Sequence, residues 1–405
     1  MRESCLVLGG GITGLACAYE LQKQGKQVTL LEASGRLGGW IETERGEFLF
    51  EKGPKSVSAA ALPFIEELDL GHEVIWAQTP RRYLWWNGRL HKVPTTPLGV
   101  MVSPVMKGIR LALLKEPLIG RYDKEDESIG HFLIRRFNKA LLDRLVHPFT
   151  MALYGSSPAE LSIRSTLPHL WQLEQQKGSV IRGMVGRRRQ PRFFSFKRGL
   201  SRLAERLGER LEAEIVLNCP AEKIRCHRDR VEVEAGGRSF VADHAYAALP
   251  PPALERLTRA PKVRVESVGR VDLGWRKGVL KMAGSGYLVP SSEEERIWGA
   301  SWDSAIFPEQ NGRAGETRIT VMMAEPTVEG ALEAVGRHLG IDEVPDFASA
   351  YRIEGAIPQY GYGHAERTQR MERDLPKRLT IVGSSFYGVS VSDCISSAQA
   401  GGSSR

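Results

Sequence analysis

The chain has 405 residues, of which 42% are hydrophobic and 26% charged, and its formal net charge is +8. This length supports two or three domains, and the composition is ordinary for a soluble globular protein. No apolar run approaches the roughly 20 residues that span a bilayer, and the first run leads into a glycine turn, so we expect a strand there rather than a signal peptide. Five widely spaced cysteines suit a reducing compartment and argue against a structural metal site: Cys5, Cys17, Cys219, Cys226 and Cys394.

A glycine motif follows the first expected strand. Gly9, Gly11 and Gly14 have the G-x-G-x-x-G spacing and precede a helix-like run that ends near Gly25. In a dinucleotide site such glycines permit a tight turn, the approach of a pyrophosphate and close helix packing, while the helix N-terminus attracts phosphate. Glu32 ends the next strand, where it can accept hydrogen bonds from ribose hydroxyls; a purely structural glycine turn leaves it unexplained. The predicted contacts are Gly9, Gly11, Ile12, Thr13, Gly14, Glu32 and Ala33.

Two further turns favour FAD over NAD. Gly38 and Gly39 allow a second close backbone approach, and Arg36 beside them can neutralise pyrophosphate charge. A simple NAD dehydrogenase does not need this loop. Another tight turn precedes a helix expected near Ser58. Together the three segments resemble the flavin amine oxidase superfamily, which implies non-covalent FAD held also by Arg36, Gly38, Gly39, Trp40, Gly53, Pro54, Lys55 and Ser56.

The far end of the chain agrees with this resemblance. An apolar strand over 379–383 ends in glycine, and a helix is expected to start near Val391. In the superfamily this segment closes over the flavin, and a helix N-terminus there stabilises negative charge on the reduced ring. The resemblance implies further contacts at Gly383, Val389, Ser390 and Val391, and at the backbone near Ala221 for the adenine. The sequence has no second G-x-G-x-x-G, so we expect electrons to come from the substrate and to leave to oxygen or a quinone.

Segments along the whole chain narrow the family. Each is similar to a signature of the oxygen-dependent, FAD-containing protoporphyrinogen oxidases: residues 81–94, 147–162, 194–200, 286–291, 305–310, 356–364 and 388–395. The resemblance implies a six-electron oxidation that makes the tetrapyrrole macrocycle aromatic and releases hydrogen peroxide when oxygen is the acceptor. In such chemistry the protein mainly positions substrate and flavin, and the sequence offers no convincing acid–base pair near a motif.

The resemblance also indicates where the substrate binds. Arg82 matches the arginine that meets a propionate of the tetrapyrrole, and a planar guanidinium suits a carboxylate. Gly286, Leu288 and Met322 match the apolar positions that pack on the rings. The alternative for Arg82 is a surface arginine on a strand, and the alternative for Leu288 and Met322 is ordinary core.

No residue is assigned a catalytic role. His147 and His364 are interpreted as structural, because neither has a visible partner in the sequence. Cys394 is interpreted as a packed thiol rather than a covalent flavin attachment, since no linkage pattern surrounds it.

The predicted fold class is α/β combined with α+β. A discontinuous, Rossmann-like FAD-binding domain is expected to take residues 1–80, 193–262 and 366–405. A mixed-sheet substrate domain is expected over 263–365 together with 81–96. Residues 97–192 are expected to form a helical, membrane-associating segment.

The membrane expectation comes from two apolar runs, 97–102 and 109–114, which are interrupted by Lys107, Arg110 and Lys115. Such a pattern favours an interfacial rather than a spanning segment; the alternative is a buried helical core. We expect a cytoplasmic protein with peripheral contact at the inner face of the cytoplasmic membrane, hand-off to a ferrochelatase and no nucleic-acid partner. A basic cluster that could meet anionic lipid, or simply be a solvated loop, comprises Arg187, Arg188, Arg189, Arg192, Lys197 and Arg198.

Two alternatives to protoporphyrinogen oxidation stay open. A coproporphyrinogen III oxidase has the same fold and chemistry but takes a substrate with four carboxylates. A catalytically silent FAD- or tetrapyrrole-binding protein is the other, because the chain departs from the family pattern. It is short, it has Ser384 where relatives have Asn or Asp, and Gly401 and Gly402 are expected to end the last helix after two or three turns.

Overall fold

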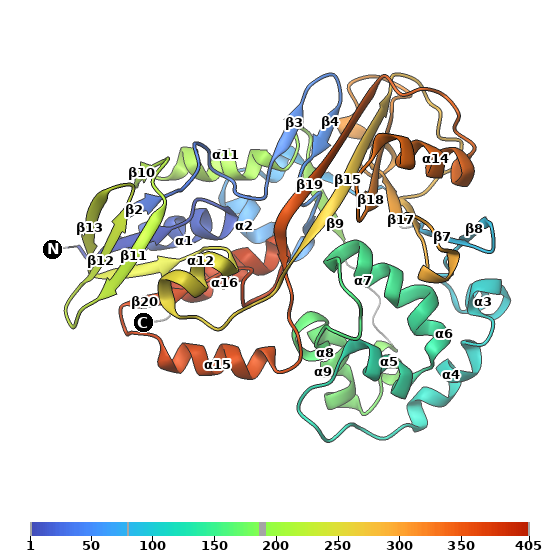
Figure 1. Ribbon diagram of the computed structural model, residues 1–405, viewed down its shortest axis with the longest axis horizontal. Helices are drawn as coiled ribbons and strands as arrows, with labels where there is room; N and C mark the ends of the chain where they lie inside the picture. The colour runs from blue at the N-terminus through green and yellow to red at the C-terminus, as the bar shows by residue number, and fades with distance from the viewer. Residues whose placement is uncertain (1, 79–80, 186–191, 404–405) are drawn as a thin grey trace. The chain divides into compact units, whose positions relative to one another are not determined.

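The computed structural model describes residues 2–78, 81–185 and 192–403, and it divides into two compact units (Figure 1). Unit 1 comprises Met1–Trp76, Pro191–Arg264 and Ala365–Arg405. Unit 2 comprises Ala77–Gln190 and Val265–His364, so it contains both the expected substrate strands and the expected helical segment. Arg187, Arg188 and Arg189 of the basic cluster lie outside the described residues.

Unit 1 is built on a parallel sheet, as the alternation of apolar strands and helices predicts. Its strand order is β10 (Glu214–Val216), β2 (Gln27–Leu31), β1 (Ser4–Leu8), β14 (His244–Ala247) and β20 (Leu379–Ile381). On one face, α1 (Ile12–Lys23) packs against α11 (Ser201–Arg210) and α16 (Val391–Ser403). Their shared core includes Leu15, Leu21, Leu203 and Ile395, all buried.

Smaller elements complete unit 1. The antiparallel sheet of β11 (Ala221–Cys226), β12 (Val231–Ala235) and β13 (Arg238–Ala242) packs on a second core, together with α12 (Pro251–Thr258). The remaining elements are β3 (Thr43–Arg45) paired with β4 (Leu49–Glu51), β9 (Phe193–Phe196) between β5 (Val57–Ser58) and β6 (Val74–Trp76), α2 (Leu62–Glu67), and α15 (His364–Asp374), which begins at the boundary of the units.

The end of α16 corrects one expectation. The helix runs through Gly401 and Gly402 instead of stopping before them. A Cβ on Gly401 would lie 2.5 Å from Cγ1 of Val382, so glycine lets the last turn pack close to the chain that leaves β20. The carbonyl of Gly402 accepts a hydrogen bond from Nε2 of Gln24 at 2.9 Å. Tertiary contacts therefore offset the low helix propensity of the two glycines.

Unit 2 is built on a seven-stranded mixed sheet. The order is β19 (Phe347–Pro358), β15 (Val265–Trp275), β18 (Thr317–Met323), β17 (Ile297–Trp302), β16 (Gly286–Leu288), β7 (Tyr83–Trp86) and β8 (Arg89–Lys92). All neighbours are antiparallel except β16 and β7. α14 (Val328–Leu339) contributes Val335 to a core with Trp275, Trp302 and Val321, which covers one face of the sheet. The β7–β8 hairpin turns at Asn87 and Gly88, both with positive φ.

The rest of unit 2 is helical, and α5, α7, α8 and α9 gather together in Figure 1. The helices are α3 (Pro97–Val102), α4 (Arg110–Lys115), α5 (Ile129–Arg136), α6 (Lys139–Leu141), α7 (His147–Tyr154), α8 (Ile163–Thr166), α9 (Pro168–Lys177), α10 (Val180–Met184) and α13 (Asp303–Ile306). A π turn over Leu142–Val146 precedes α7, and the single turn η4 (Glu116–Leu118) follows α4. Within the described chain, no helix is long and apolar enough to cross a membrane.

Candidate cofactor and substrate sites

The glycine motif forms a tight cradle at the carboxyl end of β1. A Cβ on Gly14 would lie 1.8 Å from the carbonyl oxygen of Gly9, so only glycine lets α1 pack this close to the turn. Gly9 has φ of +103°, a conformation that side chains rarely adopt. Among the described residues no side chain caps α1, whose N-cap is Gly11 and whose first turn holds no acidic residue. The first N–H groups of α1 are thus available to an anion.

Glu32 lies against this cradle rather than pointing away. Its Oε2 accepts a hydrogen bond from the backbone nitrogen of Gly10 at 2.5 Å, and its Oε1 accepts from the nitrogen of Ser34 at 2.8 Å. The backbone of Glu32 also accepts from the nitrogen of Cys219 at 2.8 Å, which places the loop before Ala221 beside it. The carboxylate, Ala33 and the chain near Ala221 therefore share one corner of unit 1.

The second glycine loop contacts the first. The backbone nitrogen of Gly38 donates to the carbonyl of Gly10 at 2.8 Å, and Gly11 and Gly38 form a parallel β-bridge. A Cβ on Gly39, where φ is +58°, would lie 2.9 Å from Cα of Gly11. Arg36 extends over this loop, and its guanidinium donates to Glu42 at 2.5 Å and to the carbonyl of Gly39 at 2.9 Å. The guanidinium is held in place by these contacts, half exposed beside the paired loops.

The third turn and the end of the chain meet at the first turn of α16. Nearby, a Cβ on Gly53 would lie 1.8 Å from the carbonyl oxygen of Trp40, so the third turn presses on the second loop. Pro54, Lys55 and Ser56 then lead into β5. At the end of β5 the backbone nitrogen of Ser58 donates a hydrogen bond to Oγ of Ser392 at 3.2 Å, so this strand contacts the first turn of α16.

Gly383 and α16 also approach the glycine motif directly. A Cβ on Gly383 would lie 2.7 Å from Oγ1 of Thr13, in the first turn of α1. Val389 and Ser390 precede α16, which starts at Val391. All twenty residues predicted to hold the cofactor therefore lie in unit 1, and most surround the paired glycine loops and the adjacent starts of α1 and α16. This cradle, with free helix N–H groups and no room for a Cβ at Gly9, Gly14 or Gly39, fits an extended dinucleotide.

The four predicted substrate residues lie in unit 2, and strand register places three of them on one sheet face. Leu288 pairs with Gly299, and Gly299 pairs with Met322, so Leu288 and Met322 stand in one row across β16, β17 and β18. Gly286, two residues before Leu288, faces the same side. Their sequence neighbours Tyr287 and Val321 belong to the core on the opposite face. Leu288 and Met322 are therefore not part of that core.

An apolar cavity of about 370 Å³ opens beside this face and includes Arg82 and Leu288. Of the described residues that line it, Arg82 alone carries a charge. The others come from the β7–β8 hairpin, from α5 and from the segment 145–170: Tyr83, Leu84, Val93, Ile129, Leu133, Leu145, Val146, Phe149, Ile163, Leu167 and Leu170. Gly286 and Met322 lie on the same sheet but do not line the cavity.

Sequence reasoning missed the helical wall of this cavity. Ile129 and Leu133 are spaced i, i+4 on α5, and Leu167 and Leu170 are spaced i, i+3 at α9, which is the pattern of any buried helix face. No motif distinguishes such residues from core. The signal that could have found them is the proximity of Arg82, which only the fold reveals.

The histidines and the thiol are packed. His364 is 3% exposed and its ring stacks on Tyr360 with centroids 4.2 Å apart. Burial lowers the pKa of His147, whose Nδ1 has no hydrogen-bond partner among the described residues. Burial raises the pKa of Cys394 to about 11, so it stays a neutral thiol. In the described part of the chain no three His, Cys, Asp or Glu side chains gather as a metal site would require.

Comparison with known proteins agrees with this geometry. The model of the family described as flavin containing amine oxidoreductase matches residues 12–400. A protoporphyrinogen oxidase from Homo sapiens is 31% identical, over 98% of this chain and 97% of its own length. A coproporphyrinogen III oxidase from Bacillus subtilis is 26% identical over the same shares. A crystal structure from Exiguobacterium sp. 255-15, provisionally named a protoporphyrinogen oxidase, has a TM-score of 0.87 and 25% identity over 99% of this chain and 98% of that one.

The family match covers nearly the whole chain and implies FAD as the cofactor, which the cradle of unit 1 fits. The relatives match along almost their full lengths, so both units are part of the resemblance. The chain belongs to the flavin-containing amine oxidoreductase family, on the branch that holds the protoporphyrinogen and coproporphyrinogen oxidases.

Proposed function

We propose that the chain oxidises protoporphyrinogen IX to protoporphyrin IX, with oxygen as acceptor and three molecules of hydrogen peroxide released for each macrocycle. The observation that carries this proposal is the apolar cavity of unit 2 with Arg82 as its charged residue. A flat, greasy macrocycle with few charged groups suits such walls, and a guanidinium suits one propionate.

The chain's own residues bind and shield the substrate. Arg82 would hold a propionate and fix the direction in which the macrocycle enters. Leu84, Phe149 and Leu288 would pack on the rings and keep water from them. The chemistry that bound non-covalent FAD supplies is the removal of two electrons at a time, three times for each macrocycle. The lowered pKa of His147, near the cavity residues Val146 and Phe149, leaves its imidazole neutral at pH 7 and adds no charge.

The same cavity favours protoporphyrinogen over coproporphyrinogen III. The second substrate has carboxylates where the first has vinyl groups, so it brings four carboxylates instead of two. A carboxylate buried without a partner costs several kcal/mol, roughly, and shifts its pKa instead of staying ionised. Walls made of Leu, Ile, Val and Phe side chains offer vinyl groups a favourable contact and offer two further carboxylates none.

Turnover with the two porphyrinogens in parallel tests the proposal. The purified protein should be yellow and should produce porphyrin fluorescence faster from protoporphyrinogen IX than from coproporphyrinogen III. Peroxide should form at three equivalents for each porphyrin when oxygen is the acceptor; full porphyrin yield without peroxide would indicate a quinone instead. A preference for coproporphyrinogen III would assign the chain to coproporphyrinogen III oxidation. A yellow protein that oxidises neither porphyrinogen would favour a non-catalytic FAD- or tetrapyrrole-binding protein.

We also propose peripheral contact of unit 2 with the inner face of the cytoplasmic membrane, where ferrochelatase hand-off would follow. Large apolar side chains of α3, α4 and η4 are exposed, among them Leu114 at 73% and Leu118 at 82%, and the rest are Leu98, Met101, Val102 and Leu111. Exposed Lys107 and Lys115 can add attraction to anionic lipid. Arg110 is engaged otherwise, because its guanidinium donates to the carbonyls of Val100 and Ser103.

Sedimentation with vesicles tests the membrane proposal. Wild type should bind vesicles of phosphatidylcholine with phosphatidylserine, and L114S/L118S should release the protein while its turnover of detergent-solubilised substrate is kept. Val344, which is also highly exposed, provides the matched control V344S. Equal binding by all three proteins would refute the proposed contact.

A further inference from the structure

Two helices that wall the apolar cavity are joined by a buried ion pair one turn away. On α5, the cavity residue Leu133 lies three residues before Arg136; on α9, Leu170 lies four residues before Glu174. Residues spaced i, i+3 or i, i+4 share a helix face, about 5.4 Å apart along the axis. The contact between Arg136 and Glu174 therefore lies about one turn from a cavity residue on each of the two helices.

The guanidinium of Arg136 has all of its donors occupied. Its Nε and Nη2 donate to Oε1 of Glu174 at 3.0 and 2.7 Å. Its Nη1 donates to Glu116 and to the carbonyl of Ile119, both at 3.0 Å, and Nη2 also donates to the carbonyl of Gly178 at 2.9 Å. An arginine has five N–H donors in a fixed plane, so these contacts define both the position and the orientation of the side chain.

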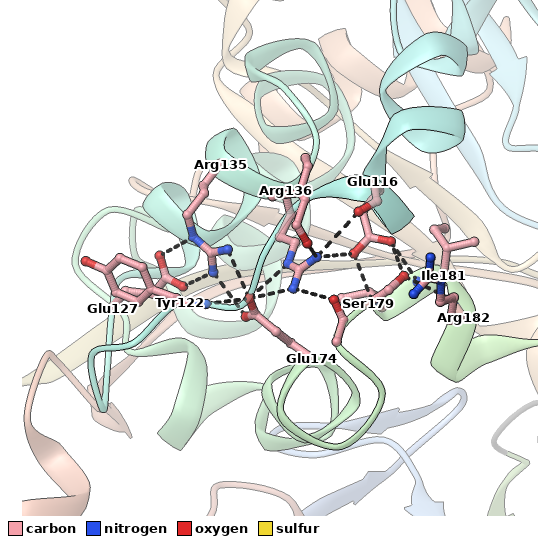
Figure 2. Close-up of polar contacts among 12 residues, drawn as sticks. Glu116, Tyr122, Glu127, Arg135, Arg136, Glu174, Ser179, Ile181 and Arg182 are labelled. Atoms are coloured by element: carbon pink, nitrogen blue, oxygen red, sulfur yellow. Dashed lines mark hydrogen bonds and ion pairs between the residues drawn. The ribbon is translucent and has the colours of Figure 1, made fainter.

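Two more charged residues extend this network, which Figure 2 shows as a chain of dashed contacts around Glu174. Arg135 donates to Glu174 from Nη1 at 2.9 Å and pairs with Glu127, which precedes the N-cap of α5. Burial alone would raise the pKa of Glu174, but hydrogen bonds from Arg135 and Arg136 outweigh it and hold that pKa below its usual range. Glu174 is thus a fixed carboxylate between two guanidinium groups.

On its other side the network reaches η4 and α10. Glu116 is fully buried and accepts hydrogen bonds from the backbone nitrogens of Val180 and Ile181 at 2.9 and 3.2 Å, and from the hydroxyl of Ser179. These contacts cap the start of α10. The side chains of Arg136, Glu116 and Glu174 are all 0% exposed, so their geometry is protected from water and from screening by salt.

A buried ion pair of this kind contributes little to stability on balance, because desolvation of the charges offsets their attraction. It does impose geometry, since the pair cannot separate without leaving two buried charges unmatched. Apolar packing alone lets leucine-rich helices slide past each other with small changes in contact. The network is therefore better explained by a requirement on the spacing of α5 and α9 than by a requirement on stability.

We propose that Arg136 is a positioning residue for the substrate: through Glu174 and Glu116 it sets the separation of α5 and α9, and with it the width of the cavity between Leu133 and Leu170. This inference rests on the proposed function, because it takes the cavity as the place where the macrocycle binds. Arg136 does not line the cavity and acts only through the two helices.

Arg136→Lys tests the proposal, because lysine keeps the charge but loses the planar guanidinium. Its three donors share one nitrogen, so it cannot bind Glu174 and Glu116 at the same time with the geometry of arginine. We expect KM for the porphyrinogen that wild type prefers to rise three- to thirtyfold, with kcat within twofold and FAD content unchanged. The Kd of the product protoporphyrin IX, measured by quenching of protein fluorescence, should rise by a similar factor. That binding assay needs no turnover, so it still reports on positioning if wild type oxidises neither porphyrinogen and the proposed function fails.

Two matched controls separate positioning from general damage. Arg202→Lys makes the same exchange in unit 1, where Arg202 holds Glu73 through Nε at 3.0 and 3.1 Å. Val335→Ala opens a cavity in the core on the opposite face of the sheet of unit 2. Both should lower the melting temperature and leave KM and the product Kd unchanged.

If Arg136→Lys does not fold, the variant E116Q/R136M/E174L replaces the three buried charges by neutral side chains and leaves Arg135 paired with Glu127. We expect it to fold and to show the same rise in KM. A folded Arg136 variant with unchanged KM and product Kd, a fall in kcat at constant KM, or an equal rise in the two controls would overturn the proposal.

Discussion

The two predicted sites are made from different parts of the chain. In unit 1 the cofactor cradle is mostly backbone: glycines at 9, 14 and 39 are so close to neighbouring main-chain atoms that a Cβ would overlap them. In unit 2 the cavity is made of side chains that come from β7, α5, α7, α9 and β16. The paired glycine loops of the first site lie within residues 9–39, and Gly383 joins them from the far end of the chain. The second site has no such local motif and combines residues about 200 positions apart, such as Arg82 and Leu288.

This difference predicts two kinds of response to substitution. A backbone cradle fails when a Cβ is added where it would overlap the main chain, as at Gly14, because the main chain cannot move away without disturbing the strand and helix it joins. In a cavity made of side chains, each substitution weakens substrate binding only in part, because each wall residue contributes a part of the contact area. Substitutions in unit 1 should therefore act on FAD content, and substitutions at the cavity should act on KM.

The largest effect is expected at Gly14. A Cβ there would lie 1.8 Å from the carbonyl oxygen of Gly9, so Gly14→Ala must shift α1 away from β1. We expect loss of more than nine tenths of bound FAD, measured by the flavin absorbance of the purified protein, and a melting temperature lower by several degrees.

Gly46 is the matched control, because a Cβ there would meet no atom within 4 Å. Gly46→Ala should keep full FAD content. Retention of FAD by Gly14→Ala would mean that the cradle tolerates added atoms, and the contrast between the two units would lose its basis.

The glycine cradle was predictable from the sequence because its geometry is local. Gly9 and Gly14 are spaced to suit a single strand–turn–helix unit, and the overlap that a Cβ on Gly14 would cause is with Gly9 of the same unit. A Cβ on Gly9 would instead lie 2.5 Å from the carbonyl oxygen of Ala248, a contact that the local pattern does not contain. The pairing of Gly11 with Gly38 could also be anticipated, since both loops follow strands of one parallel sheet. The continuation of α16 through Gly401 could not, because it depends on Val382, a contact that no local propensity contains.

The second effect in size is expected at Arg82. Arg82→Ala removes the charged residue of the cavity lining, and a hydrogen bond to a charged group is worth about 1.5–3 kcal/mol. KM for the porphyrinogen should therefore rise by about ten- to a hundredfold, at unchanged FAD content, in steady-state assays.

Arg81→Ala serves as the control. Arg81 is the neighbour of Arg82 on the same chain segment and is exposed as Arg82 is, but it does not line the cavity. It should change KM less than twofold. Loss of FAD in Arg82→Ala, or equal changes in both variants, would contradict the place assigned to Arg82.

The cavity itself was only partly predictable. Arg82 and Leu288 could be named because they stand in recognisable segments, and both line the cavity. Leu133 and Leu170 could not be distinguished from core, since an apolar helix face has the same periodicity whether it packs on protein or on a ligand. Arg136 and Glu174 are 38 residues apart, and no sequence pattern predicts that they meet.

The third expected effect is a dependence of the stability of unit 2 on pH. His338 lies beneath β16, where its Nδ1 is 3.0 Å from the hydroxyl of Tyr287, and burial lowers its pKa in spite of Glu295 nearby. The unfolded chain then binds a proton more readily than the folded one, so stability is complete above about pH 6.5 and falls below it. The loss should approach about 1.4 kcal/mol for each pH unit at most, as measured by denaturant unfolding between pH 7.5 and 5.

His338→Gln keeps a hydrogen-bonding side chain but removes the titration. It should reduce the loss of unfolding free energy at acid pH. His72→Gln, on an exposed turn of unit 1, should leave that loss unchanged. An unchanged loss in His338→Gln would assign the acid sensitivity to other groups, among which the half-buried His147, whose pKa burial also lowers, is the next to test.

The smallest effect is expected at Asp393, whose side chain caps the start of α16 beside the cofactor cradle of unit 1. Asp393 and Ser390 cap the start of α16 reciprocally: the nitrogen of Ser390 donates to Oδ2 of Asp393 at 3.2 Å, and the nitrogen of Asp393 donates to Oγ of Ser390 at 3.1 Å. Asp393→Ala should destabilise unit 1 by about 1 kcal/mol, the usual value for a lost helix cap, as measured by denaturant unfolding. FAD content at saturating FAD should stay unchanged, because the N–H groups of Val391 and Ser392 remain. If Asp393→Ala instead lost FAD as Gly14→Ala should, the cradle of unit 1 would depend on side chains as much as the cavity of unit 2 does.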